Sequence, residues 1–278
     1  MRMIIGTIRK MLTQPTNPVS YWLPIGQESL ALNEFIGSDM TFQFTGNIYC
    51  IECGRKTKKS FNQGYCFPCL RSLAACDTCI VKPETCHYEK GTCREPEWGK
   101  ANCMRPHVIY VANTSGLKVG ITRASQVPTR WIDQGAIQAI PMFKVESRLQ
   151  SGLIEVVLKN YANDRTEWRK MLRGNPTSVD LVHERKRLYE QVRPDLSQYE
   201  GWIDTSLASS SRDGGILFNY PVINYPQKIT SHNFDKQQSV SGCLQGIKGQ
   251  YMIFDNGVLN IRKFGGYELE LSVGKNSG

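Results

Sequence analysis

Two pairs of cysteines near the start of the chain have the spacing of a metal site. Cys50 and Cys53 form one Cys-x2-Cys pair, Cys66 and Cys69 form another, and twelve residues separate the two pairs. In such pairs the backbone N–H groups of a tight turn point at the thiolates, and four cysteines from two turns surround one tetrahedral zinc ion. A glycine follows the first pair and another precedes the second, as tight turns require. We therefore predict a structural zinc site here.

A second group of cysteines and histidines follows and contains more candidate ligands than one tetrahedral zinc needs. The favoured ligands are Cys76, Cys79, Cys86 and Cys93, with Cys103, His87 or His107 as substitutes. Uneven spacing of four cysteines also suits an iron–sulfur cluster. Nothing else in the sequence indicates redox chemistry, so we favour zinc, as a second structural ion, and keep the iron–sulfur cluster as the alternative.

The distribution of the ten cysteines favours metal binding over disulfides. Nine of them lie between Cys50 and Cys103, and only Cys243 is distant. Such clustering fits a reducing compartment. No signal peptide and no run of about 18 apolar residues is apparent. We expect a cytoplasmic protein without a membrane anchor.

Between the first two cysteine pairs lies the basic segment Arg55-Lys56-Thr57-Lys58-Lys59. It would form the tip of a ribbon between the metal-binding turns, where it could contact phosphates. The alternative is a solvated loop that balances the negative charge of the thiolates. The whole chain, with 34 basic and 25 acidic residues, carries a formal charge of +9. This charge permits nucleic acid as a partner without requiring it.

A third set of polar residues surrounds a predicted β-hairpin between His107 and Arg130. Two β-branched and aromatic runs flank a short polar turn, which predicts strand, turn, strand, loop and the start of a helix. Tyr110 lies in the first strand, Lys118 and Arg123 lie in the second, and Arg130 begins the helix.

These residues resemble the GIY-YIG nuclease core over about residues 107–172. The resemblance rests on Ile109-Tyr110, on Lys118-Val119-Gly120, and on Arg130 ten residues past the glycine. The family hydrolyses phosphodiesters with a tyrosine, an arginine and a glutamate that holds one divalent metal. By position, the resemblance implies that Tyr110 and Arg130 are catalytic and that Glu155 binds magnesium or manganese.

The sequence departs from the nuclease pattern at two positions. Val108 stands where the first motif has glycine, and Lys118 replaces the second tyrosine. A free phenol has a pKa near 10 and is a poor base at neutral pH. An ammonium group at Lys118 would favour the phenolate of Tyr110, provided that an odd number of loop residues places both side chains on one sheet face.

Each of these residues also has a purely structural interpretation. Tyr110 could be a half-buried strand residue, Arg130 a solvated helix charge, and Gly120 the site of a bulge. Glu155 lies off the apolar face of its predicted helix and could simply pair with Lys159 four residues on.

Several longer segments resemble an uncharacterised family of bacterial proteins of unknown function. They include KSFNQGYCFPC, CDTCIVKPETCHYEKGTCREPEWG and IKGQYMIFDNGVLNIRKFGGYELEL, so this resemblance covers most of the chain. It supports a cytoplasmic zinc-containing architecture more than any particular reaction.

The elements that would position these groups suggest an α+β protein of several modules. Short strands are expected before Thr45, with one or two helical turns over Ser29 to Ile36. Several more strands are expected after residue 200. Among them, Asp255-Asn256-Gly257 is a strong hairpin signal. We expect an N-terminal β module (1–46), a zinc-ribbon-like double zinc module (47–106), a GIY-YIG-like α/β core (107–175), a helical linker (176–200) and a small antiparallel, OB-like β-barrel (201–278). Aromatic residues of that barrel, Phe254, Phe264 and Tyr267, would stack bases or form ordinary core.

The leading hypothesis is a metal-dependent phosphodiesterase or nuclease that acts on DNA or RNA. In this hypothesis Tyr110 is the base or orients water, Lys118 is its electrostatic helper, Arg130 clamps the phosphate, and Glu155 holds the metal. Arg123 is a further candidate catalytic residue without an assigned role. The hypothesis requires Tyr110, Arg130 and Glu155 to converge on a solvent-open cleft. The alternatives are an inactive zinc-containing nucleic-acid-binding protein and a scaffold for protein partners; the sequence does not indicate the oligomeric state.

Overall fold

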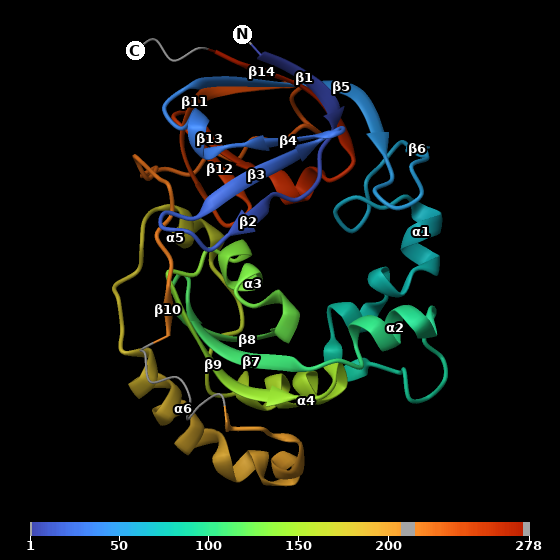
Figure 1. Cartoon of the computed structure of the whole chain (residues 1–278), viewed down its shortest axis with the longest axis vertical. Coiled ribbons are helices and arrows are strands. Elements are labelled where there is room, and N and C mark those ends of the chain that lie inside the picture. Colours follow the sequence, from blue (N-terminus) through green and yellow to red (C-terminus); the bar gives the residue numbers. More distant parts are fainter. Residues whose placement is uncertain (1, 207–214, 275–278) are drawn as a thin grey trace. The chain divides into compact units, whose positions relative to one another are not determined.

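The computed structural model describes residues 2–206 and 215–274, and the chain divides into two compact units (Figure 1). The first unit comprises Met1–Arg71, Leu172–Gly174 and Phe218–Gly278, and the second comprises Ser72–Met171 and Asn175–Leu217. The boundary between Arg71 and Ser72 separates the first two cysteine pairs from the later cysteines. The segment 47–106 therefore contributes one cysteine group to each unit.

The first unit is built on a seven-stranded antiparallel sheet in which strands from both ends of the chain alternate. Its strand order is β1 (Arg2–Thr7), β14 (Tyr267–Val273), β5 (Asp39–Tyr49), β11 (Ser239–Lys248), β12 (Tyr251–Phe254) and β13 (Gly257–Asn260), with the short β6 (Lys56–Thr57) pairing with β5. Phe254 pairs with Gly257, so Asp255 and Asn256 form the expected two-residue turn.

This sheet differs from the closed barrel expected for the C-terminal segment. Within the described residues it is open, with β1 at one edge and β13 at the other. The C-terminal strands are completed by the N-terminal ones, because β5 lies between β14 and β11. The protein is thus a mixed α+β structure with antiparallel sheets and no closed barrel.

A second, three-stranded antiparallel sheet belongs to the same unit. It consists of β2 (Leu12–Gln14), β3 (Ser20–Ile25) and β4 (Glu28–Ala31). The helical turns expected from Ser29 onward are reduced to a 3-10 turn over Asn33–Phe35, because Ser29 and Leu30 pair with Pro24 and Leu23 in β3. A Cβ at Gly6 would lie 2.4 Å from the Cα of Gly26, so β1 approaches the β3–β4 turn too closely for any side chain.

The second unit contains a four-stranded antiparallel sheet and most of the helices. The strand order is β10 (Ile216–Leu217), β9 (Gln138–Val145), β7 (His107–Asn113) and β8 (Leu117–Arg123). Among the described residues, the helices with assigned bounds are α1 (Phe67–Ser72), α2 (Pro96–Asn102), α3 (Thr129–Asp133), α4 (Arg148–Leu158), α5 (Trp168–Leu172) and α6 (Leu181–Leu196). In the described part of the chain, no helix combines the length and apolar character needed to cross a bilayer.

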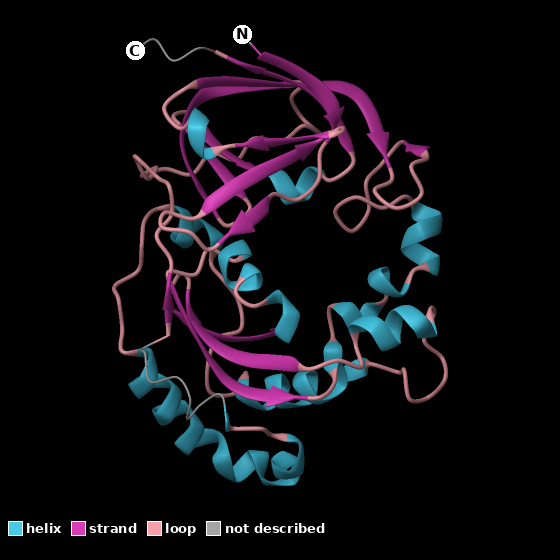
Figure 2. Ribbon diagram, in the orientation of Figure 1, coloured by secondary structure: helices cyan, strands magenta, loops and turns pink. Residues whose placement is uncertain are grey.

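The sheet of the second unit lies between helices on both faces (Figure 2). Ile109, Val111 and Val119 point to one face, where they pack in a core with Ile154 of α4 and Leu188 of α6. The other face carries Tyr110, whose ring packs edge-on against Trp131 of α3 at a centroid distance of 5.6 Å. This alternation separates an aliphatic core from the face that bears the polar residues.

Helix boundaries in this unit follow local capping. Ser147 Oγ accepts a hydrogen bond from the backbone N–H of Gln150, and the Ser147 backbone N–H donates one to Gln150 Oε1, which forms a capping box. The helix carrying Glu155 therefore begins at Arg148. The helix α3 begins at Thr129, one residue before Arg130.

Candidate functional site

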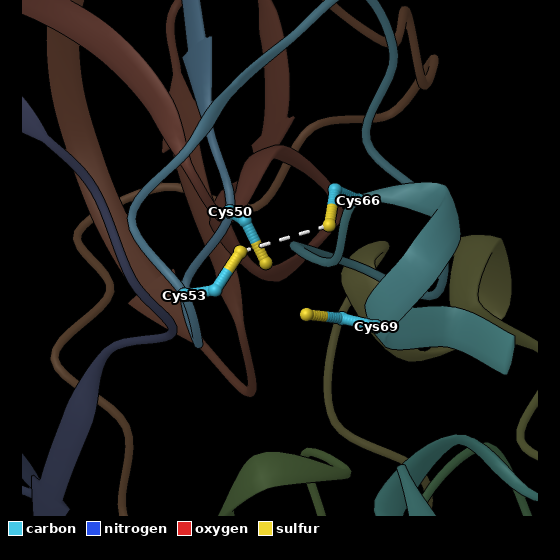
Figure 3. Close-up of side chains that lie close together, drawn as sticks. All are labelled: Cys50, Cys53, Cys66 and Cys69. Carbon is cyan, nitrogen blue, oxygen red and sulfur yellow. Dashed lines mark hydrogen bonds between the residues drawn. The ribbon is translucent and has the colours of Figure 1, made fainter. Parts of the chain in front are cut away.

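The first cysteine group has the geometry of a tetrahedral metal site. The sulfur atoms of Cys50, Cys53, Cys66 and Cys69 all lie within 4.8 Å of one another and point toward a common centre (Figure 3). The Sγ atoms of Cys53 and Cys66 are 3.7 Å apart. A tetrahedron with Zn–S bonds of about 2.3 Å has edges of about 3.8 Å. The cluster can hold a structural metal such as zinc.

Two tight turns present these thiols. Cys50 follows β5, and its carbonyl accepts a hydrogen bond from the Gly54 N–H at 3.0 Å, while Gly54 has a φ of +72°. Cys66 precedes α1, where the Leu70 N–H donates to the Cys66 carbonyl at 2.9 Å. These are the two turns that the Cys-x2-Cys spacing predicts.

Backbone N–H donors and burial shift the pKa values of the thiols of this cluster in opposite directions. Burial raises the pKa of Cys50, but the N–H groups of Cys53 and Cys66 outweigh it and lower that pKa to about 6. Burial and contact with the other three thiols raise the pKa of Cys69. Without a cation, the four groups cannot all ionise, so metal binding must release protons.

The second cysteine group surrounds a small cavity in the other unit. The cavity has a volume of about 10 Å³, and its lining includes four thiols, those of Cys79, Cys86, Cys93 and Cys103. Cys76, which the spacing favoured as a ligand, is not among the lining residues, and Cys103, proposed as a substitute, is. Burial and the charges of Asp77, Cys86 and Cys103 raise the pKa of Cys79 to about 11.

The two histidines proposed as substitute ligands lie in different surroundings. His87 lines the cavity, but its Nδ1 is 2.8 Å from Thr92 Oγ1 and its Nε2 is 3.4 Å from the Asp77 carboxylate. His107 is fully buried, and burial lowers its pKa to about 4, so the ring is neutral. Its Nε2 has no hydrogen-bond partner among the described residues.

The hairpin brings together most of the predicted catalytic residues. Asn113 pairs with Leu117, so the loop has three residues, Thr114 to Gly116, and Tyr110 and Lys118 share a sheet face. The Tyr110 hydroxyl donates to Gln134 Oε1 at 2.8 Å and accepts from the guanidinium of Arg130.

Glu155, on α4, lies near enough for its charge to act on Tyr110 and Lys118. Its charge raises the pKa of Tyr110, and that pKa reaches about 12 chiefly because the phenol is buried. Burial lowers the pKa of Lys118 to about 8, and its ammonium donates to the Asp164 carbonyl at 3.2 Å. The expectation that Lys118 would favour the phenolate of Tyr110 is therefore not met, because desolvation outweighs it.

The group is closed rather than open. Tyr110 is 0 % and Lys118 3 % exposed. Arg130 is half-buried, and Glu155 pairs with Lys159 at 3.4 Å, the structural alternative given by the sequence. Lys159 also contacts Asp164 at 3.3 Å. Within the described residues, Glu155 is not part of any compact set of metal-ligating side chains.

Arg123 lies apart from this group. It pairs in register with His107, which places its side chain on the face opposite Tyr110, and its guanidinium donates to the Asn102 side chain of α2. Sequence reasoning missed Gln134 and Asp164. No sequence motif marks either residue, because their contacts arise from the folding of α3 and of the segment after α4 onto the sheet.

A basic and aromatic groove lies in the first unit beside the four-cysteine cluster. It has a volume of about 620 Å³ and is open to solvent. Its lining residues are Phe44, Gly46, Ile48, Lys56, Thr57, Lys58, Phe234, Asp235 and Tyr267. Phe44 is half-buried, whereas Phe254 and Phe264 of the predicted base-stacking set are 1 % and 0 % exposed and belong to the core.

The fold and these sites define a mixed α+β protein with a four-cysteine cluster able to hold a structural metal. A family profile described as "Protein of unknown function (DUF2797)" matches residues 37–269. The chain belongs to that family. No curated protein and no solved structure matches it.

Proposed function

We propose that this protein binds single-stranded nucleic acid through the groove beside the four-cysteine cluster, which zinc holds together. The observation that carries the proposal is the combination of an accessible aromatic ring, Phe44, with the lysines of the ribbon tip, Lys56 and Lys58. Single strands are bound by base stacking on aromatic side chains together with cations along the backbone.

The ring of Phe44 is held rigidly for such a role. Its centroid lies 5.1 Å from that of Tyr267 and 6.4 Å from that of Phe234. Both neighbours are almost completely buried, at 5 % and 3 % exposure, so they support the ring rather than offering faces of their own. A base would stack on Phe44, and its aromatic backing limits the entropy lost on binding.

The charges around the groove favour an anionic ligand. Lys56, Lys58 and Lys59 are exposed on the segment between the two cysteine turns. The one carboxylate in the lining, Asp235, accepts a hydrogen bond from the Tyr267 hydroxyl at 2.6 Å and lies 3.5 Å from Lys263. Its charge is thus partly compensated, and the zinc site fixes the base of the lysine-bearing segment.

Binding of labelled single-stranded RNA and DNA, followed by fluorescence anisotropy over a range of salt, tests this proposal. We expect binding that weakens with salt, and a Lys56→Gln/Lys58→Gln variant that binds at least fivefold more weakly. Loss of two phosphate contacts should lower the slope of log affinity against log salt by about 1.4. A Lys170→Gln/Lys186→Gln variant, altered at two exposed helix lysines, is the matched control. Wild-type affinity in the groove variant would contradict the proposal.

A second candidate function is phosphodiester cleavage, which is supported by the hydrogen bond between Arg130 and Tyr110 and by Glu155, whose charge acts on Tyr110. A protonated, buried Tyr110 is unsuited to be the base, so it would position Arg130 instead. Magnesium or manganese would have to displace Lys159 from Glu155. Cleavage of the bound oligonucleotide that requires a divalent ion and is lost in both Arg130→Ala and Glu155→Ala would establish this function. Binding without cleavage would leave the first proposal alone.

A further inference from the structure

Four of the five cysteines of the second unit line one small cavity. Cys79, Cys86, Cys93 and Cys103 line a cavity of about 10 Å³, which is about the volume open to one water-sized sphere. They come from four separate short segments: the turn Thr78–Ile80, the residue after the turn Pro83–Thr85, the segment before α2, and the end of α2. Four cysteines that line one cavity from four segments form a candidate ligand set.

The spacing of these thiols is wider than that of a zinc site. Four sulfurs at about 2.3 Å from one zinc ion leave no room between them for a water-sized sphere. In the first unit, all four sulfurs lie within 4.8 Å of one another. Across the described residues, the sulfurs of Cys86, Cys93 and Cys103 do not meet that limit as a set. The wider spacing of these thiols favours a group larger than a single ion.

We propose that Cys79, Cys86, Cys93 and Cys103 bind a [4Fe–4S] cluster, in which each thiolate ligates one iron and four sulfides fill the space between. Four cysteine thiolates are the usual ligands of such clusters. The proposal concerns the second unit only and is independent of the nucleic-acid groove in the first.

The surroundings of the cavity suit a cluster with net negative charge. Arg148 of α4 is largely buried and donates to the carbonyl oxygens of Cys79 at 3.2 Å and of Ile80 at 2.5 Å. Its guanidinium therefore lies beside the thiolates, where its charge offsets theirs. Tyr88 and Trp98 add aromatic surface to the lining, which limits access of water.

The neighbouring Asp77 and His87 are a less suitable ligand pair. Together with Cys79 they form a set within 4.8 Å. However, Asp77 binds the Arg94 guanidinium at 2.8 Å, and a metal ion there would displace that cation. His87 also uses its Nδ1 to contact Thr92. Asp77 and His87 line the same cavity as the four thiols, whose described lining includes no lysine or arginine.

Metal and sulfide analysis of the protein purified without oxygen from iron-supplied cells tests the proposal. We expect about four iron and four acid-labile sulfide per chain, together with one zinc at the first cluster. A broad visible absorption should bleach with dithionite, and the reduced protein should give an electron paramagnetic resonance signal. The wild-type protein alone suffices for these readouts.

Variants then assign the ligands. Cys86→Ser and Cys103→Ser should lose at least three quarters of the iron while keeping the zinc, and Cys76→Ser, the matched control outside the cavity lining, should keep both. Two zinc ions and no iron or sulfide in the wild type under these conditions would overturn the proposal. So would loss of iron in Cys76→Ser with full retention in Cys103→Ser.

Discussion

Gly120 lies directly opposite Tyr110 in the β7–β8 pair, and a Cβ at Gly120 would come within 2.7 Å of the Tyr110 hydroxyl oxygen. The phenol occupies the space that any larger residue would need. The second-motif glycine and the first-motif tyrosine are therefore one packing unit, whatever chemistry they serve.

Gly120→Ala should lower the free energy of unfolding by about 1–3 kcal/mol, the usual cost of overpacking a rigid core. Chemical denaturation measures it. Gly201→Ala, where a Cβ would meet nothing within 4 Å, is the matched control and should cost far less. In a Tyr110→Leu background the additional cost of Gly120→Ala should fall; equal costs in both backgrounds would show that the two residues are not coupled.

Lys248 predicts a pH dependence of stability. It is 0 % exposed, its ammonium donates to the Gly174 carbonyl at 3.1 Å, and burial lowers its pKa to about 7 from 10.5. At pH values between the folded and unfolded pKa of Lys248, the unfolded chain binds more protons than the folded chain. The free energy of unfolding therefore rises with pH, by at most about 1.4 kcal/mol per pH unit. Relative to wild type, Lys248→Met should remove this slope.

Urea unfolding from pH 7 to 9.5 tests this dependence, with Lys186→Met, an exposed lysine on α6, as control. Identical pH slopes in wild type and Lys248→Met would mean that Lys248 is charged in the folded state.

The first cysteine cluster predicts proton-linked zinc binding. Zinc must displace the protons of buried thiols such as Cys69, whose pKa burial raises, so affinity should fall as pH falls. Cys66→Ser should lose one zinc per chain and lower the melting temperature of the first unit. Zinc titration with a chromophoric chelator and scanning calorimetry measure both effects. Cys243→Ser, remote in sequence, should retain the zinc, and unchanged zinc content in Cys66→Ser would refute the site.

Arg148 ties α4 to the second cysteine group. Arg148→Met would leave the carbonyl groups of Cys79 and Ile80 without their donor, at a cost of about 1–3 kcal/mol each, and should weaken metal retention in the second unit only. Metal analysis and thermal unfolding report the two effects. Arg165→Met, whose side chain is 93 % exposed, should change neither; full metal retention in Arg148→Met would contradict the role given to this residue.

Much of the local structure follows from sequence patterns. The hairpin of β7 and β8, the turn at Asp255 and the strand β14 lie where alternation and turn residues place them. The barrel was not predicted correctly, because alternation within a strand does not reveal whether the two edges of its sheet meet. The strand β4 was missed because pairing with β3 outweighs the local helical preference of Ser29 to Ala31.

The sites were harder to predict for a physical reason. Adjacent cysteine spacing identified the first cluster, since both turns are local. The spacing of the later cysteines could not show whether Cys76 or Cys103 lines the cavity. Cys103 lies at the end of α2, and only the tertiary structure places that end beside the other cysteines. Likewise, the burial of Tyr110 depends on Trp131 and Gly120, which close over the phenol from α3 and β8.

The most direct test of the proposed function is photochemical cross-linking of the protein to a single-stranded oligonucleotide, with the attachment sites mapped by mass spectrometry. We predict cross-links at Phe44 and on the peptide that carries Lys56 and Lys58, and their loss in Lys56→Gln/Lys58→Gln. Cross-links confined to the second unit, or none at low salt, would contradict binding in the groove.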